Sequence, residues 1–282
     1  LQRSWKMKMA GHTMGTPDLD LRGAMRLFSK IGYQGIEIRC AKDGQLDTTT
    51  ADDAFLKLVR EWRKETGIEI TCLTSYFKDF VTERREAELA GLKQVVEIAA
   101  KLEVPMIRVY GGLDPVPEGY TLEQDWQRTA SGIREIGILA KKHSIEICVE
   151  THNGSLTLSA ADTVKMVEMV EMDNVGILFD YAWIYWAKME SPAEAVKLCA
   201  PYLRYVHYKD WLIDWDKGDT EQRQARLMGE GSVPWPEVFA ALREVGYDGW
   251  ITDEYEKYWH PALPEPADGM ARNLAYVQSL LD

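Results

Sequence analysis

Short β-rich runs alternate with longer amphipathic segments from one end of this 282-residue chain to the other. The candidate strands are residues 6–10, 35–40, 68–75, 105–110, 145–150, 175–180, 203–207 and 249–254. The clearest helical segments between them are residues 52–66, 84–102, 122–143, 159–172 and 235–245. Strand and helix patterns that repeat in this order are typical of a parallel sheet whose strands are joined by right-handed helical crossovers.

Eight strand–helix repeats favour a closed (β/α)8 barrel, the TIM barrel, over an open doubly wound sheet. A chain of 282 residues has the size usual for one such barrel, and no GxGxxG sequence opens a helix as it does in dinucleotide-binding open sheets. We therefore expect residues 1–282 to form a single α/β domain, with its active site at the carboxyl ends of the strands.

Four polar residues stand within a residue or two of the ends of the last four predicted strands. They are Glu150, Asp180, His207 and Glu254. A single carboxylate after a strand is more often a helix cap or a solvated loop residue, but four such residues on contiguous strands meet at one face of a barrel. We therefore predict that they bind one divalent metal. Three carboxylates and one imidazole suit Mn²⁺, Mg²⁺ or Co²⁺ and are compatible with Zn²⁺.

A site of this composition predicts proton chemistry on a small, neutral substrate. Three carboxylates leave a net negative charge around a divalent ion, which disfavours anionic ligands. A sugar or cyclitol can instead chelate the ion through adjacent hydroxyl and carbonyl oxygens. The ion would polarise the carbonyl and stabilise an ene-diolate, while positioned carboxylates move the proton for a gain of ~10²–10⁴ in rate.

The charge and the cysteines exclude other classes of protein. The formal net charge is −12, and we expect no nucleic-acid partner because such binding depends on cationic contacts with phosphates. No run of about 18 apolar residues occurs, so we expect no membrane partner. The four cysteines, Cys40, Cys72, Cys148 and Cys199, have no zinc-site spacing and are predicted to be buried free thiols, which fits a cytoplasmic location.

The motifs around the four polar residues are similar to those of a known family. They are VETHNG at residues 149–154, FD at 179–180, VHYKD at 206–210, GEG at 229–231 and DE at 253–254. On these motifs nearly the whole chain resembles the sugar phosphate isomerase/epimerase family of xylose isomerase-like TIM barrels, which includes ketose 3-epimerases and inosose dehydratases. The resemblance implies that Glu150, Asp180, His207 and Glu254 bind one divalent metal, often Mn²⁺, and that the two glutamates are the acid–base pair. It implies a metal-dependent sugar or cyclitol isomerase or epimerase.

One segment departs from the family pattern and predicts an aromatic rim. Many relatives place a small residue and a histidine shortly after the aspartate of the sixth strand, whereas this chain reads DYAWIYW at residues 180–186. The indoles of the loops either stack on a sugar face or an aglycone ring, or fill the core and interfaces. They are Trp183, Trp186, Trp211, Trp215 and Trp259, of which we predict that Trp183 and Trp211 contact the substrate.

Further side chains near the same face are candidates for catalysis and substrate binding. His152, two residues past Glu150, is either a proton shuttle and substrate donor or a residue that orients a ligand. We also predict substrate contacts for His12 at the end of the first strand and for Lys209, which otherwise pairs with Asp210. Arg223 or Arg226 reaches the substrate from the long segment 209–234, a candidate lid.

Two charges inside apolar strands need partners, because a buried charge is costly without one. We predict that Glu37 and Arg108 form an ion pair across the barrel.

One other function, a lyase or dehydratase, remains open beside the isomerase, and the sequence argues against two more. A lyase or dehydratase would use the same metal site on a keto-sugar, an inosose or a 3-keto-glycoside, including C-glycoside cleavage, and would expel a leaving group in place of reprotonation. A DNA-repair nuclease on this barrel would need more than the five histidines present and a basic face. A sugar-binding protein without chemistry would not need the complete ligand set. Exposed aromatic residues on the lid also predict a homodimer or homotetramer.

Overall fold

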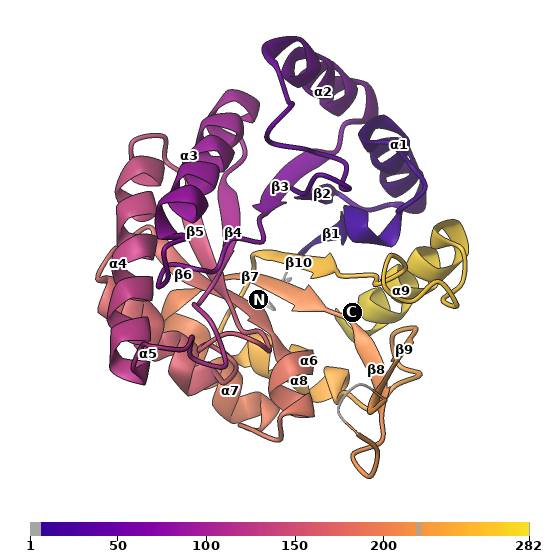
Figure 1. Ribbon diagram of the computed structural model, residues 1–282. Helices are drawn as coiled ribbons and strands as arrows, with labels where there is room; N and C mark the ends of the chain where they lie inside the picture. Colours follow the sequence, from indigo (N-terminus) through magenta and orange to yellow (C-terminus); the bar gives the residue numbers. More distant parts are fainter. Residues whose placement is uncertain (1–6, 219–220, 282) are drawn as a thin grey trace.

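The computed structural model describes residues 7–218 and 221–281, and eight parallel strands in this part of the chain close into a barrel (Figure 1). The order around the barrel is β1-β10-β7-β6-β5-β4-β3-β2. These strands are β1 (Lys8–His12), β2 (Gly35–Arg39), β3 (Glu69–Thr74), β4 (Met106–Tyr110), β5 (Glu146–Glu150), β6 (Val175–Asp180), β7 (Leu203–Tyr208) and β10 (Trp250–Asp253). The predicted (β/α)8 fold is confirmed. Residue 6, which the sequence analysis placed in the first strand, lies outside the described residues.

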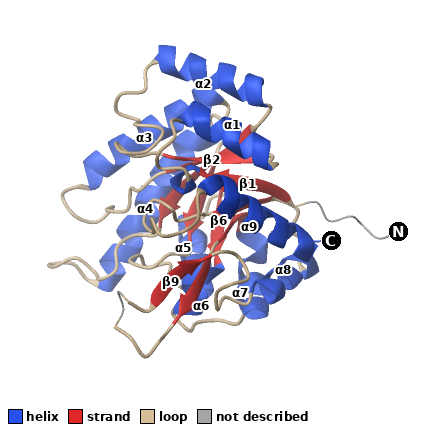
Figure 2. Ribbon diagram, turned by 90° about the vertical axis from the view of Figure 1, so that its right-hand side faces the viewer, coloured by secondary structure: helices blue, strands red, loops and turns tan. Residues whose placement is uncertain are grey.

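Helices surround the barrel, as Figure 1 and the side view in Figure 2 show. They are α1 (Leu21–Ile31), α2 (Asp53–Thr66), α3 (Arg85–Leu102), α4 (Leu122–Lys141), α5 (Ala160–Val170), α6 (Tyr181–Trp186), α7 (Pro192–Cys199), α8 (Trp235–Glu244) and α9 (Pro266–Leu281). Two predicted starts are side-chain caps: Asp52 accepts the N–H of Phe55, and Ser159 accepts that of Asp162. The sequence analysis did not predict α6, which begins directly after Asp180 and is capped by its carboxylate.

Inward-facing residues form two layers inside the barrel. The lower layer is hydrophobic and contains Ala10, Cys72, Met106, Cys148, Leu178, Tyr205 and Trp250. Because side chains of a strand alternate between its two faces, the next inward residue lies two positions further along each strand. Those residues are polar and lie nearer the carboxyl ends: His12, Thr74, Arg108, Glu150, Asp180, His207 and Thr252. The hydrophobic layer thus forms the floor under a polar, water-excluded layer.

Two insertions extend the carboxyl-terminal end of the barrel. Residues 209–234, predicted as a lid, contain an antiparallel hairpin of β8 (Asp210–Ile213) and β9 (Arg223–Arg226). In Figure 1 this hairpin extends from the barrel at the lower right, near α9. The second insertion, residues 256–265, follows β10 and carries Trp259 and two prolines before α9 begins.

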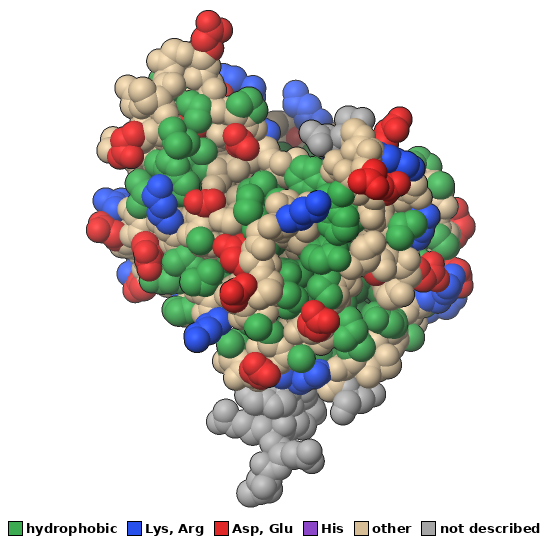
Figure 3. Space-filling model, turned by 90° about the horizontal axis from the view of Figure 1, so that it is seen from below, with side chains coloured by type: hydrophobic (Ala, Val, Ile, Leu, Met, Phe, Trp, Pro, Cys, Tyr) green, Lys and Arg blue, Asp and Glu red, His purple; other side chains and the backbone are tan. Residues whose placement is uncertain are grey.

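The described part of the surface has a mixed character. On the face shown in Figure 3, Lys and Arg side chains are dispersed among Asp and Glu, with hydrophobic side chains between them. None of the helices formed by the described residues combines the length and apolar character that a bilayer crossing needs.

Candidate metal centre and substrate pocket

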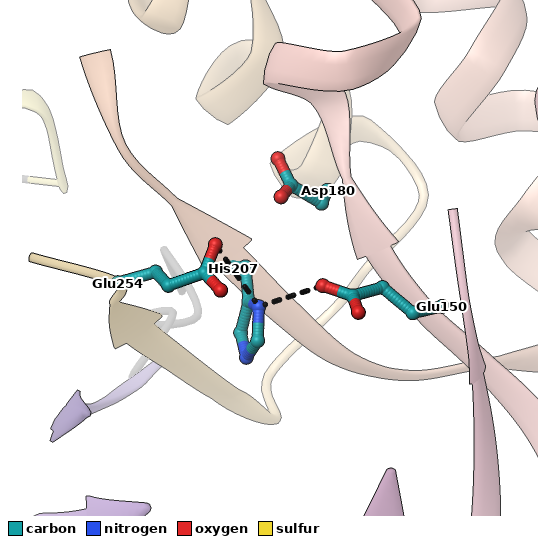
Figure 4. Close-up of side chains that lie close together, drawn as sticks. All are labelled: Glu150, Asp180, His207 and Glu254. Carbon is teal, nitrogen blue, oxygen red and sulfur yellow. Dashed lines mark ion pairs between the residues drawn. The ribbon is translucent and has the colours of Figure 1, made fainter. Parts of the chain in front are cut away.

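The four predicted ligands converge at the carboxyl-terminal end of the barrel. Glu150 and Asp180 end β5 and β6, His207 is the penultimate residue of β7, and Glu254 directly follows β10. These four strands are neighbours in the barrel. One ligand atom from each residue lies within 4.8 Å of the other three, and all four side chains are buried. Figure 4 shows Glu150 and Glu254 on opposite sides of the His207 ring, with Asp180 completing the group.

A chain of hydrogen bonds fixes the orientation of His207. Its Nε2 lies 2.9 Å from Oε2 of Glu37, so Nε2 carries the proton that the carboxylate accepts. Thr74 donates its hydroxyl to the other oxygen of Glu37 and lies 3.2 Å from Nε2 of His12. His12 Nδ1 accepts the N–H of Met14 at 2.9 Å, so His12 donates through Nε2. This order leaves the Nδ1 lone pair of His207 facing the carboxylates, as a metal-binding histidine requires.

The predicted pair between Glu37 and Arg108 is wrong. Glu37 binds His207 and Thr74 instead. Arg108 Nη1 lies 3.2 Å from Oε2 of Glu150, and its guanidinium packs over the ring of Tyr110 at 4.2 Å. Arg108 on β4 therefore contacts the candidate metal ligand Glu150 on the adjacent β5. Glu37 on β2 contacts the candidate ligand His207 on β7 across the barrel.

The ionisation of the cluster suits cation binding. Burial raises the pKa of Glu150, but Arg108 and His152 outweigh it and lower that pKa to about 2. Burial raises the pKa of Asp180 to about 7, against the opposing effect of Lys209. Burial lowers the pKa of His207, yet the carboxylates of Glu37 and Glu254 raise it well above its ordinary value. The buried carboxylates thus attract a positive charge, which a proton on His207 or a metal ion can supply.

The unsatisfied polar atoms of the cluster are the test of whether a metal fits. Within the described chain, Oε1 of Glu150 and Nδ1 of His207 have no hydrogen-bond partner, whereas Oε2 of Glu150 and Oδ2 of Asp180 each face a cationic side chain, Arg108 and Lys209. Oε1 of Glu150 and Nδ1 of His207 face each other at 3.2 Å. Buried acceptors that face one another are unfavourable unless a cation lies between them. The donor set therefore fits a divalent ion, and three oxygens with one imidazole nitrogen are ligands that Mn²⁺, Mg²⁺ or Zn²⁺ accepts.

Lys209 lies beside this cluster and not with Asp210. Its ammonium is 2.7 Å from Oδ2 of Asp180 and also contacts Glu254. Asp210 instead accepts the N–H groups of Gly229 and Gly231 at 2.9 and 3.0 Å. Gly229 has φ +82, a conformation that favours glycine, so the GEG motif closes the hairpin segment around Asp210. The pairing of Lys209 with Asp210, the alternative to a substrate contact, is therefore absent.

A cavity of about 400 Å³ opens above the cluster. Its lining includes six residues that were predicted to act at the site: His152, Trp183, Lys209, Trp211, Arg223 and Glu254. It also includes residues that the sequence analysis did not assign to the site: Met14, Tyr76, Arg108, Tyr110, Glu256 and His260. Arg108 could have been found from the strand period, because it lies two positions after the inward-facing Met106. The tyrosines gave no local signal.

The side chains of the rim have distinct roles. His152 lies between the rings of Tyr110 and Trp183, with centroid distances of 4.8 and 4.5 Å. The guanidinium of Arg223 packs over Trp183, Trp186 and Trp211 at 4.4–5.0 Å. Trp186 donates to Gln222, and this bond ties α6 to the hairpin segment.

Trp215, predicted in the aromatic rim, and His12, predicted to contact the substrate, both support the structure. Trp215 donates its indole N–H to the carbonyl of Trp186 and so braces the hairpin against α6. His12 is completely buried and lies beneath the cavity. Both of its ring nitrogens are already hydrogen-bonded, one to Met14 and the other to Thr74. The structure therefore does not bring His12 to the cavity wall, where a substrate contact would require it.

Comparison with known proteins agrees with this architecture. An inosose dehydratase from Klebsiella pneumoniae (strain 342) is 30% identical over 169 residues, 55% of each chain, so the match spans about half of that relative. The fold is shared with 3-keto-D-glucoside 4-epimerase from E. coli, with TM-score 0.76, 19% identity and coverage of 97% of this chain and 100% of that one. It is also shared with D-allulose 3-epimerase from Methylomonas sp., with TM-score 0.79, 17% identity and 98% coverage of both. A family model described as xylose isomerase-like TIM barrel matches residues 25–280, and the chain belongs to that family.

Proposed function

We propose that the protein is a divalent-metal-dependent enzyme that removes a proton from the carbon next to the carbonyl of a keto-sugar or keto-cyclitol. The observation that carries this proposal is the buried group of Glu150, Asp180, His207 and Glu254, whose unsatisfied atoms lie beneath a cavity. We expect Mn²⁺ as the ion. When bound, the ion supplies Lewis-acid polarisation of the substrate carbonyl.

The two glutamates are placed to move the proton. Glu150 and Glu254 contact the same nitrogen of His207 from opposite sides, at 3.2 and 3.6 Å (Figure 4). The pKa of each lies below its ordinary value, because burial is outweighed by Arg108 for Glu150 and by Lys209 for Glu254. Both are therefore ionised at neutral pH. One carboxylate accepts the proton from one face of the substrate carbon, and the other, once it has taken a proton from water, returns it at the opposite face.

Lys209 and Trp183 provide donors to substrate oxygens. Burial lowers the pKa of Lys209, but Asp180 and Glu254 outweigh it, so the ammonium stays charged at neutral pH. A positioned cation of this kind stabilises the negative charge that develops on an oxygen during proton abstraction. The indole N–H of Trp183 has no hydrogen-bond partner among the described residues and is available to a hydroxyl of the substrate.

His152 fits the role of a neutral side chain that positions the substrate. Its Nδ1 contacts the carbonyl of Asn153, which can only accept, so Nδ1 carries the proton. Burial lowers the pKa of His152 to about 4, which leaves Nε2 as an unprotonated acceptor at neutral pH. This nitrogen can accept a hydrogen bond from a substrate hydroxyl, whereas so low a pKa makes His152 a weak base for removing a proton from carbon.

Elimination is the second candidate outcome, and the likeness to inosose dehydratase favours it. The same proton abstraction, followed by loss of a group two carbons from the carbonyl, gives an unsaturated product. The leaving group is water for an inosose or an aglycone for a 3-keto-glycoside. The aromatic wall formed by Trp183 and Trp211 suits such a glycoside.

An isotope experiment tests the proposal and separates the two outcomes. The Mn²⁺-loaded protein is incubated in D₂O with keto-hexoses, inososes and 3-keto-glucosides, and the products are analysed by mass spectrometry and NMR. Epimerisation returns deuterium to an intact sugar, whereas elimination gives an unsaturated product. Chelation and the Glu150→Gln variant should both abolish product formation. Unchanged turnover of a confirmed substrate by Glu150→Gln would refute the acid–base assignment.

A further inference from the structure

A second cavity of about 540 Å³ adjoins the first. Arg223, Trp259 and His260 line both cavities. The second cavity lies between β9 with the residues that follow it, the insertion after β10, and Arg272 of α9. None of the four residues of the metal cluster lines the second cavity, whereas Glu254 lines the first.

The walls of the second cavity differ in chemistry. One wall is apolar and consists of the segment from Pro261 to Pro264. The other carries Arg226 and Arg272. Arg272 is neutralised by Glu230 at 2.7 Å. Arg226 donates only to neutral acceptors, Oε1 of Gln224 at 2.8 Å and the adjacent carbonyl, and no carboxylate of the described residues lies within 4.0 Å of it.

Trp259 stands at the junction of the two cavities. Its side chain is 55% exposed, which is unusual for an indole. It packs edge-to-face on Tyr258, with ring centroids 4.5 Å apart and an interplanar angle of 89°. An exposed aromatic face beside a cavity is a platform on which a flat ring can stack.

We propose that the second cavity is a subsite for a second ring of the substrate, one that is joined to the keto-sugar through a glycosidic bond. This inference rests on the proposed function and specifies its substrate as a glycoside. The ring stacks on Trp259, lies against the apolar wall, and presents a hydroxyl or carboxylate oxygen to Arg226. An aromatic aglycone and a second sugar share this chemistry, namely a flat face with oxygen acceptors at its edge.

Binding measurements with glycosides that are not consumed test the subsite. Methyl β-D-glucopyranoside, phenyl β-D-glucopyranoside and cellobiose lack the reactive carbonyl and are titrated against the Mg²⁺-loaded protein by saturation-transfer NMR. The expected result is that one of the two-ring probes binds about tenfold more tightly than the methyl glycoside, the gain expected from a stacked ring. A gain for the phenyl compound alone identifies an aglycone site, and a gain for cellobiose alone identifies a sugar site.

Variants connect this gain to the named residues. Trp259→Ala should abolish the affinity gain of the two-ring probe over the methyl glycoside. Trp259→Phe should retain most of this gain, and Arg226→Ala should reduce it. Arg22→Ala, at an exposed arginine of α1 that lies outside both cavities, is the matched control and should retain the full gain. Circular dichroism confirms that each variant is folded.

The outcomes separate the subsite from the proposed function. Equal affinity for all three probes, or a gain that survives both Trp259→Ala and Arg226→Ala, overturns the subsite, and so does the failure of every probe to bind. In each of these cases deuterium incorporation into keto-hexoses or inososes would still support the proposed function. Absence of exchange with every keto-compound would instead refute the proposed function and remove the basis of the subsite.

Discussion

Replacing Glu37 by glutamine should weaken metal binding without removing any ligand. Glu37 is fully buried, and its two oxygens accept separate hydrogen bonds, from Nε2 of His207 at 2.9 Å and from Thr74. An amide of the same size offers one acceptor and one donor group, so its NH₂ must face one of these donors. Either His207 loses the partner that keeps its proton on Nε2, or a buried hydroxyl is left without an acceptor.

The expected size of the loss in metal affinity follows because Glu37 contacts the candidate ligand His207 and is not itself one of the four candidate ligands. Loss of a partner that orients a metal-binding histidine costs 10–100-fold in metal affinity, which is about 1.4–2.7 kcal/mol. Isothermal titration of chelator-stripped protein with Mn²⁺ measures this change directly. Glu69→Gln, at a half-exposed glutamate of β3 paired with Lys8 at 3.9 Å, is the matched control and should bind Mn²⁺ as the original protein does. A folded Glu37→Gln protein whose Kd for Mn²⁺ stays within twofold of the original would refute this reasoning.

Four further predictions concern the metal, the acid–base groups and the thiols. Mn²⁺ at 100 times its Kd should stabilise the stripped protein by about 2.7 kcal/mol, seen as a higher Tm in scanning calorimetry; an unchanged Tm would contradict a metal site. Glu254→Gln should lower the rate of deuterium exchange by ~10²–10⁴ while circular dichroism remains unchanged. Lys209→Met should lower kcat by ~10²–10³ if, as proposed, its ammonium stabilises the charge on the substrate oxygen; an equal kcat would exclude that role. Because burial raises the pKa of the cysteines, an aromatic disulfide reagent should label none of them in the native protein and all of them after unfolding; native labelling would show an accessible thiol at one of Cys40, Cys72, Cys148 and Cys199.

Local sequence patterns predicted most of the barrel and the four candidate ligands. The alternation of β-rich and amphipathic segments requires only the periods of strand and helix, which neighbouring residues determine. The period of two also places Glu150 on the same face as Cys148 and Asp180 on the same face as Leu178, and both pairs face inward in the structure. Once a parallel barrel is assumed, the strand ends meet at one face, and the ligand set follows.

Other features depend on contacts that no local pattern specifies. Helix α6 forms where the sequence analysis expected a loop, because the carboxylate of Asp180 caps it and its indoles pack on the hairpin. The sequence analysis predicted residues 209–234 as a lid but did not predict the hairpin of β8 and β9 within it. Strand β9 has the polar sequence RQAR, and β8 and β9 pair with each other rather than with the barrel. Strand β9 therefore carries no hydrophobic alternation that would reveal it.

By itself, the sequence determined the order of strands and helices and the chemical nature of the side chains at the strand ends. Only the tertiary structure decided which buried charge meets which. Glu37 and His207 are 170 residues apart in the chain and become partners because closure of the barrel brings β2 and β7 to face each other across its axis. Arg108 meets Glu150 because β4 and β5 pair side by side in the sheet. Buried charges pair with whatever opposite charge or donor lies within a few ångströms, and that distance is set by the barrel and not by separation along the chain.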